Sequence, residues 1–404
     1  MVSTELTYDP VQEAHQLREQ LGSHRRRLAF FLGAGTSMAV GMPGLEALTK
    51  TVSEIMPPEH RAGFDEVSKA AGVSANLEEI LDKTRLCCEL IGEDQNRTYC
   101  GLGGSAAKAL ERSITRAIYD EVSRPAPDGF EPHIRFAQWL REIERDFPPE
   151  IFTTNYDLLL ELGLESDPSV PYFDGFVGSV NPFFVPESVE ADGSRETMSN
   201  YPPRAWVRLW KVHGSIGWRI GKQLTAGGRR IYRTAATLQE ADEELLIYPA
   251  RQKYEESRKL PYMAYVDRLR RFASLGESLL VILGYSFRDE HLNEIVFQGL
   301  RSNVRFNVLA FVRGNETYNR VRNLVSPFRR LALYGPKAAL IGGEERSWQW
   351  KADMSKDLPS TYWDQANEQF LLGEFKSFVR FLAKSVALMQ ESPLMKEQNM
   401  ELKG

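Results

Sequence analysis

The chain contains few cysteines. Among its 404 residues, only Cys87, Cys88 and Cys100 carry thiols. They are too few and too clustered for the disulfide framework of a small secreted protein, and they cannot form the paired CxxC knuckles of a zinc module. We therefore expect no structural zinc site, and a reducing cytoplasm as the compartment.

The sequence also lacks a long hydrophobic run and an excess of positive charge. No stretch approaches the roughly 20 apolar residues of a membrane span, and the first residues lack the basic and apolar regions of an export signal. The 55 acidic residues outnumber the 50 basic ones, which gives a formal net charge of -5. These absences predict no membrane segment and no direct binding of nucleic acid by this chain.

What the chain does have is the composition and patterning of a folded α/β protein. Hydrophobic residues make up 42% and charged residues 26% of the sequence, as in ordinary globular domains. Nearly continuous apolar runs alternate with segments of helical periodicity, and such runs are typical of parallel strands buried on both faces. The pattern predicts an α/β fold with a Rossmann-like, doubly wound parallel sheet. Its main expected strands are 28–32, 150–153, 207–212, 278–283 and 305–312.

Longer segments are expected before, between and after these strands. Residues 165–205 are rich in Pro, Gly, Asp and Ser, and we expect them to run over the surface. The sequence predicts three divisions: an N-terminal helical segment at 1–27, a central α/β domain at 28–330 and a C-terminal segment at 331–404. The central domain is expected to contain a helical insertion at 44–125 and a loop or hairpin insertion at 217–250.

The C-terminal segment is expected to hold a long amphipathic helix followed by a frayed tail at 391–404. Such a helix packs against the core, and at a chain end it also suits an oligomer or partner surface. The apolar residues placed on one face of this helix are Phe370, Leu371, Phe375, Phe378, Val379, Leu382, Val386 and Met389.

A glycine-rich turn follows the first predicted strand, at Gly33-Ala34-Gly35-Thr36-Ser37. Glycine lets a backbone approach a pyrophosphate closely, and the amides and helix N-terminus that follow favour its negative charge. Many strand-to-helix turns require glycine only for a positive φ angle. The turn therefore does not identify a ligand by itself.

Polar side chains follow the next predicted strands. Thr154, Asn155 and Asp157 come directly after one strand, and His213 follows another, at the edge where parallel sheets bind ligands. Taken alone, the Asn and Asp also fit a helix cap, and the histidine also fits a hydrogen-bonded loop residue. Of the six histidines, only His213 has the surroundings of a catalytic group.

A fourth turn, after the strand at 278–283, contains Gly284 and Ser286. The serine is placed to hold a ribose or phosphate, while Asp289 caps the next helix. His291 and Asn293 are expected to be structural. The remaining histidines are expected to face solvent: His15, His24, His60 and His133.

These four motifs, in this order, resemble those of the sirtuin (silent information regulator) family, which has GAGxS, T-x-N-x-D and HG elements. The resemblance spans roughly residues 28 to 312, and four short motifs carry it. In this chain they read GAGTS at 33–37, TTNYD at 153–157, HG at 213–214 and GYS at 284–286.

The resemblance implies that the chain binds NAD in a sirtuin-like domain. It places the nicotinamide ribose and amide at Asn155 and Asp157, makes His213 the base, and puts the adenosine side near Ser286. Polar groups beside the sugar would stabilise its oxocarbenium-like transition state as nicotinamide departs. The other residues it assigns to NAD binding are Gly33, Ala34, Gly35, Thr36, Ser37, Thr154 and Gly284.

Two departures from deacylating sirtuins change the expected reaction. The four-cysteine zinc module after the HG element is absent, and MAVGMPGLEALTK replaces the phenylalanine- and arginine-containing segment after the glycine motif. The chain looks more like the sirtuin-like NAD hydrolases of bacterial anti-phage defence, in which water is the acceptor. That resemblance implies an NAD glycohydrolase that depletes NAD in abortive infection, as a homo-oligomer with a HerA-class ATPase partner.

Two other readings stay open. The chain could be a non-catalytic subunit that binds NAD or ADP-ribose and assembles a complex. It could instead be an NAD-dependent deacylase or ADP-ribosyltransferase, although the missing zinc cysteines argue against this.

Overall fold

The computed structural model describes residues 6–72, 75–92, 96–190, 206–225, 228–234, 245–247, 261–351 and 361–390. Within these residues a nine-stranded sheet has the order β16-β15-β14-β13-β12-β1-β4-β8-β5. The strands from β14 to β5 run parallel, and β15 and β16 are antiparallel to their neighbours. The doubly wound parallel sheet predicted from the sequence is confirmed. The bounds are β1 Arg27–Leu32, β4 Glu150–Thr153, β5 Tyr172–Phe173, β8 Val207–Lys211, β12 Ser278–Leu283, β13 Phe306–Phe311, β14 Leu331–Tyr334, β15 Ala338–Ile341 and β16 Glu344–Ser347.

The chain order reverses at β1. From β1 the chain adds β4 and β8 on one side, and it later adds β12, β13 and β14 on the other. Loops that leave the carboxyl ends of β1 and β12 therefore diverge at a topological switch point, where doubly wound sheets bind ligands. All four motif turns follow β1, β4, β8 or β12 and so lie at this edge.

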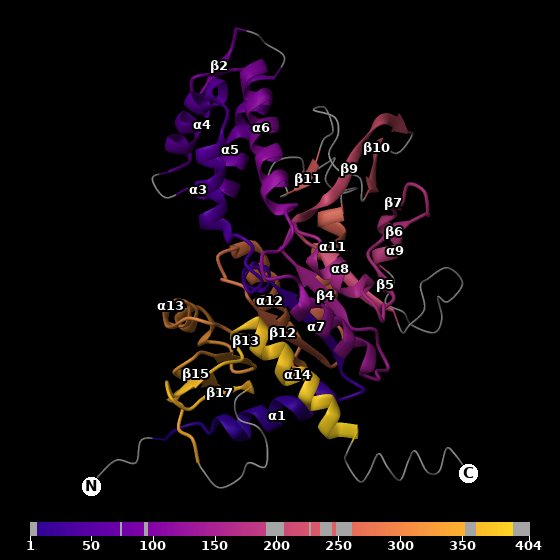
Figure 1. Cartoon of the computed structure of the whole chain (residues 1–404), viewed down its shortest axis with the longest axis vertical. Coiled ribbons are helices and arrows are strands. Elements are labelled where there is room, and N and C mark those ends of the chain that lie inside the picture. The colour runs from indigo at the N-terminus through magenta and orange to yellow at the C-terminus, as the bar shows by residue number, and fades with distance from the viewer. Residues whose placement is uncertain are drawn as a thin grey trace.

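Both faces of the sheet are covered by helices (Figure 1). Side chains of β1 alternate between two cores: Phe30 belongs to the core that includes residues of α1, α7 and α14, whereas Phe31 belongs to the core that includes residues of α11, α12 and α13. This alternation explains why β1 reads as a continuous apolar run, because neither face meets solvent. The helix bounds are α1 Pro10–Gly22, α7 Glu131–Glu142, α8 Leu159–Glu165, α11 Pro261–Ser274, α12 Glu290–Ser302, α13 Asn315–Val325 and α14 Phe375–Gln390.

The helical insertion forms a separate bundle beyond the carboxyl edge of the sheet (Figure 1). It has its own hydrophobic core, which includes Ile216, and Tyr156 and Leu158 from the loop after β4 pack against that core. Helix α5 begins with a capping box in which the Asn76 side chain accepts from the amide of Glu79, and the Glu79 carboxylate accepts from the amide of Asn76. The elements are α3 Leu45–Ile55, α4 Pro58–Ala71, α5 Leu77–Ile91, β2 Thr98–Tyr99, β3 Leu102–Gly103 and α6 Gly104–Val122.

A second, antiparallel sheet of five strands adjoins the first within the described residues, in the order β11-β9-β10-β7-β6. It contains the hairpin expected within 217–250, where Thr225 of β9 pairs with Gly228 of β10; Gly227 and residues 235–244 and 248–250 lie outside the described residues. The prediction that residues 165–205 run over the surface without regular structure is wrong for the first part of this range, which forms β5, β6, β7 and α9. Residues 191–205 lie outside the described range. The bounds are β6 Phe176–Val177, β7 Phe183–Phe184, α9 Pro186–Glu190, β9 Gly214–Thr225, β10 Gly228–Arg233 and β11 Leu245–Ile247.

The C-terminal helix starts later than the sequence pattern predicts. Phe370 belongs to β18 (Gln369–Phe370), which pairs with β17 (Trp363–Asp364), and Leu371 precedes the helix. A Cβ atom at Gly373 would lie 2.3 Å from the carbonyl oxygen of Val312, so the chain turns there in close contact with the sheet edge before α14 begins. The predicted tail at 391–404 and the side chains of Val386 and Met389 lie outside the described residues.

None of the helices in the described part of the chain combines the length and the apolar character that a bilayer span requires.

A buried ion pair joins the sheet to α11. Glu150 Oε2 accepts from Arg268 Nε at 2.8 Å and Oε1 accepts from Arg268 Nη2 at 2.7 Å, and Trp210 Nε1 donates to the same carboxylate at 2.7 Å. Removing Arg268 leaves a buried carboxylate without its main counter-charge. We expect Arg268→Met to lower the free energy of unfolding by about 3 kcal/mol.

Arg270→Met, on the same helix, is the matched control. Arg270 pairs with Asp267 at a position where both side chains are about half exposed, so its loss is expected to change stability by no more than about 0.5 kcal/mol. Urea denaturation of the two variants checks the prediction, and equal losses would contradict it.

Candidate functional site

The two glycine turns at the switch point pack directly on each other. The amide of Gly33 donates to the carbonyl of Leu283 at 2.9 Å, and the amide of Gly35 donates to the carbonyl of Gly284 at 2.9 Å. A Cβ at Gly33 would lie 2.5 Å from the Gly284 oxygen, and one at Gly284, where φ is +64°, would lie 2.7 Å from the Thr36 nitrogen. Close approach of two backbones therefore requires glycine at both turns.

This packing limits what the first turn offers to a ligand. The amides of Gly33, Gly35 and Thr36 donate to protein carbonyls, and helix α2 spans only Gly35–Met38. Ala34 is exposed at the edge. Contact of this turn with a pyrophosphate stays a prediction.

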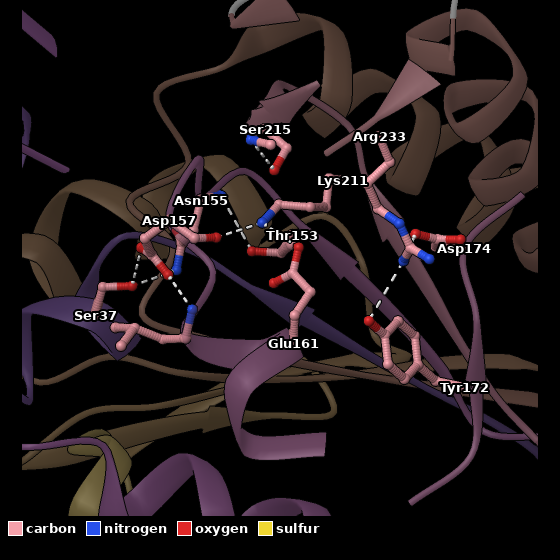
Figure 2. A network of polar contacts seen from close by, with 12 residues as sticks. Ser37, Thr153, Asn155, Asp157, Glu161, Tyr172, Asp174, Lys211, Ser215 and Arg233 are labelled. Atoms are coloured by element: carbon pink, nitrogen blue, oxygen red, sulfur yellow. Dashed lines mark hydrogen bonds and ion pairs between the residues drawn. The ribbon is translucent and has the colours of Figure 1, made fainter. Parts of the chain in front are cut away.

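Asn155 lies at the centre of a buried polar network at the same edge (Figure 2). Its Nδ2 atom donates to Thr36 Oγ1 at 3.0 Å and to Ser37 Oγ at 2.8 Å. Both hydroxyls donate elsewhere, Thr36 to the Gly33 carbonyl and Ser37 to Asp157 Oδ2. Each hydroxyl has one proton and already donates it, so toward Asn155 each can only accept a hydrogen bond. The NH2 group of Asn155, and not its carbonyl oxygen, must therefore face both hydroxyls.

The network fixes the orientation of the Asn155 amide and leaves its carbonyl oxygen without a hydrogen-bond donor. Asn155 is 7% exposed, yet its Oδ1 atom is buried and accepts no hydrogen bond. A buried acceptor without a donor costs free energy, so in a native structure it calls for a partner such as a ligand, an ordered water or an ion. A hydroxyl-rich ligand such as a ribose fits this requirement.

Asp157 has both of its carboxylate oxygens occupied. Oδ2 accepts from the Ser37 hydroxyl at 2.6 Å, and Oδ1 accepts from the amide of Leu159, the first residue of α8, at 3.0 Å. The second contact is a local turn of the Asx type directly before α8, whose N-cap is Leu158 and has no side-chain cap, so Asp157 is not the helix cap that its sequence also allowed. Through the first contact Asp157 holds Ser37, and thereby Asn155, in place.

Two further residues support this network, and neither was among the predicted site residues. Thr153 Oγ1 donates to the Leu32 carbonyl at 2.8 Å and accepts from the Asn155 amide at 3.1 Å. Lys211 is 3% exposed, and its Nζ atom donates to the Asp157 carbonyl and, at 2.8 Å, to Glu161 Oε1. A lysine at the end of a strand with three apolar residues was the available sequence signal. Thr154, which was predicted, is half-buried, and its amide donates to the Leu32 carbonyl at 3.3 Å.

His213 lies at the end of β8, the strand next to β4, as the sequence predicts. Strands β4 and β8 pair Thr153 with Lys211, so Asn155 and His213 each lie two residues past paired strand ends. His213 Nε2 is 3.0 Å from Asp289 Oδ2, and its Nδ1 is 3.8 Å from Glu78 Oε1. Each ring nitrogen thus faces a carboxylate.

These carboxylates favour the charged form of His213. Burial would lower the pKa of its imidazole, but the hydrogen bonds and charges of Asp289 and Glu78 outweigh burial and raise the pKa to about 9. For Asp289, burial would raise the pKa, and the contact with His213 and the Leu292 amide lower it instead. The histidine is therefore an imidazolium at neutral pH in the free chain.

The turn after β12 places an exposed serine beside side chains that form a buried hydrogen-bond network. Ser286 is exposed, and its carbonyl accepts from Arg320 Nη2 at 2.9 Å. Asn293 is structural, as predicted: its Nδ2 donates to the Phe287 carbonyl at 2.9 Å, and its Oδ1 accepts from Tyr285 at 3.0 Å. Asp289 caps α12 through the Leu292 amide, and its second role beside His213 was not predicted.

His133, expected to face solvent, is instead 1% exposed on α7, and its ring centroid lies 5.0 Å from that of Phe375 with the two rings tilted at 53°. The expectation was wrong because His133 lies three and four residues before Phe136 and Ala137, on the apolar face of that helix. Neither ring nitrogen has a hydrogen-bond partner. Burial lowers the pKa of His133 to about 4, although the charge of Asp157 opposes the shift.

This histidine makes stability depend on pH. Above pH 6.5 the imidazole is neutral in both folded and unfolded chains. As pH falls from 6.5 towards 4 only the unfolded chain takes up the proton, which removes about 3 kcal/mol of stability. We expect His133→Leu to lack this part of the acid destabilisation, and His15→Leu, at an exposed position, to retain it. Urea denaturation between pH 7 and pH 4.5 measures the difference, and parallel profiles for the three proteins would contradict the prediction.

Among the described residues, no group of three or more His, Cys, Asp or Glu side chains is arranged to hold a metal ion.

A comparison with protein-family models matches residues 149–326 to the SIR2-like domain. The matched range begins just before β4 and ends just after α13, so it includes Asn155, His213 and Ser286, while β1 and its glycine turn precede it. The match supports a sirtuin-like domain in this part of the chain, and SIR2-like domains are generally NAD-dependent enzymes. A comparison with curated proteins gives no match.

Proposed function

We propose that the chain hydrolyses NAD at the bond between nicotinamide and ribose, which gives nicotinamide and ADP-ribose. The observation that carries the proposal is the Asn155 carbonyl oxygen, which is buried, fixed in orientation and without a donor. It lies past β4 at the carboxyl edge, beside the switch point at which such sheets bind dinucleotides. The match of this region to the SIR2-like domain supports the same ligand.

The residues of the site have distinct tasks in this reaction. Asn155 accepts a hydrogen bond from a ribose hydroxyl or from the attacking water, and its fixed dipole favours the positive charge that develops on the sugar. Thr36, Ser37 and Asp157 keep the Asn155 amide in this orientation before the substrate arrives. This preorganisation reduces the reorganisation that the reaction would otherwise require.

His213 is proposed to activate the water. Its Nε2 atom donates to Asp289, which orients the ring as the aspartate does in a Ser-His-Asp triad. Nδ1 is then the nitrogen that takes the proton from water. In the free chain Nδ1 faces Glu78 instead, so this step requires that nitrogen to lose its proton first.

We further propose that the reaction depletes NAD in anti-phage defence, and that a homo-oligomer of the chain works with a HerA-class ATPase. Support for this comes from the sequence, through the missing zinc module and the altered segment after the glycine motif. Adenosine is proposed to lie near Ser286 and the turn after β12.

One observation favours a second candidate, a non-catalytic subunit that binds NAD or ADP-ribose. The carboxylates of Asp289 and Glu78 raise the pKa of His213 and so favour its cationic form. A cation of this kind binds an anionic ligand but does not accept a proton.

The test is a product assay on the full chain, alone and mixed with a HerA-class ATPase, with NAD at saturating concentration. Equal amounts of nicotinamide and ADP-ribose, lost in both Asn155→Ala and His213→Ala, support the hydrolase. Calorimetric binding of NAD without products in either mixture supports the binding subunit and overturns the hydrolase. Nicotinamide release that requires an added acyl-lysine peptide or protein acceptor overturns both.

A further inference from the structure

Glu78 links the helical insertion to His213. It lies in the first turn of α5, within a segment that the capping box of Asn76 and Glu79 fixes in place. Its Oε1 atom accepts a hydrogen bond from the Tyr156 hydroxyl and faces His213 Nδ1 at 3.8 Å. One carboxylate of the insertion thus contacts residues that follow two strands of the sheet, β4 and β8.

The partial burial of Glu78 and His213 strengthens the interaction between their charges. Glu78 is 22% exposed and His213 8% exposed, so water screens their charges less than at the surface. Glu78 and Tyr156 also line a small hollow whose other lining residues are apolar. Its other lining residues are Leu45, Leu48, Leu77, Leu81 and Ile118.

Among the described residues, further charged or titratable groups close to His213 come from the loop after β12 and the start of α12. Asp289 bonds Nε2 directly, and Tyr285 donates to the Asp289 carbonyl at 3.2 Å. His291 is exposed and lies close enough to lower the pKa of Asp289. Of these groups, Asp289 acts on Nε2 and Glu78 acts on Nδ1, so the two carboxylates have separable effects.

We infer that Glu78 is a positioning residue by which the helical insertion keeps a proton on Nδ1 of His213. Without the Glu78 carboxylate that proton passes more readily to solvent water, and Nδ1 becomes an acceptor, while Asp289 still orients the ring. The insertion thereby controls the reactivity of the site. The part of the inference that concerns catalysis rests on the proposed function, and the part that concerns the protonation of His213 does not.

The test is an NMR titration of the histidine side chains in the full-length chain. The His213 signal is identified by its absence from His213→Gln. In Glu78→Gln we expect the pKa of His213 to fall by about one pH unit or more, because one of its two counter-charges is lost. Glu89→Gln, which removes an exposed carboxylate from the same helix, is expected to leave that pKa unchanged.

Tyr156→Phe provides a second variant with little risk to the fold. It removes the hydroxyl that anchors Glu78, and we expect the His213 pKa to fall by less than in Glu78→Gln. An unchanged His213 titration in both variants would overturn the inference.

The pH profile of NAD turnover separates the inference from the proposed function. If His213 is the base, the limb of the profile that it governs moves to lower pH in Glu78→Gln by the same amount as the pKa. Turnover at pH 7 then rises about tenfold for each pH unit by which the limb moves. A displaced titration with no turnover in any variant would reject the hydrolase and leave the role of Glu78 standing. Turnover that changes while the titration stays in place would reject the role of Glu78.

Discussion

The Asn155→Ala chain is expected to lose NAD hydrolysis by about a hundredfold to a thousandfold in kcat, the usual cost of removing one fixed dipole from the site of developing charge. The substitution removes the one buried carbonyl oxygen in this network that lacks a donor. It also releases Thr36 Oγ1 and Ser37 Oγ from their shared donor. We expect a small loss of stability and a large loss of rate, measured by urea denaturation and by nicotinamide release.

Asn303→Ala is the matched control for this prediction. Asn303 donates from Nδ2 to the carbonyls of Ala273 and Gly276, away from the motif turns, and its Oδ1 accepts from the Arg305 amide. Its removal is expected to lower stability with kcat unchanged. Equal turnover in Asn155→Ala and Asn303→Ala would show that the Asn155 network is only structural.

The second large effect is expected for Gly284→Ala. A Cβ there meets two costs: the residue has φ of +64°, and the new atom would lie 2.7 Å from the Thr36 nitrogen and 2.9 Å from the Gly35 carbonyl carbon. The two turns at the switch point must then separate. We expect a loss of about 3 kcal/mol or more in the free energy of unfolding, from backbone strain and overpacking together, and a loss of NAD binding.

Gly276→Ala isolates the first of these costs. Gly276 has φ of +58°, and a Cβ there meets nothing within 4 Å, so its replacement is expected to cost only about 1 kcal/mol. Denaturation of both variants, with calorimetry of NAD binding, measures the difference. If Gly284→Ala were no less stable than Gly276→Ala and bound NAD normally, close packing of the two turns would not shape the site.

Much of the sheet was predictable from local pattern. The strands β1, β12 and β13 are nearly continuous apolar runs, β4 and β8 have apolar centres, and all five end in glycine or polar turns. Burial on both faces makes such runs conspicuous. The position of Asn155 and His213 at one edge followed, since parallel strands end on the same side. Strands β14 to β16 were missed, because they are short and the last, Glu344–Ser347, is polar.

The contacts that tune the site were not predictable in the same way. Glu78 reads as an ordinary acidic residue in the first turn of a helix, and only the packing of the insertion against the motif loops brings it to His213. The role of Asp289 beside His213 was hidden behind its correctly predicted role as a cap. Similarly, the orientation of Asn155 depends on two hydroxyls that are more than 110 residues away in sequence.

The most direct test is a structure of the Asn155→Ala chain with NAD bound. We expect one dinucleotide across the carboxyl ends of β1 and β12, with the nicotinamide ribose beside residue 155 and within reach of His213, and the adenosine towards Ser286. A dinucleotide bound elsewhere, or one whose nicotinamide ribose lies away from residue 155 and His213, would contradict it.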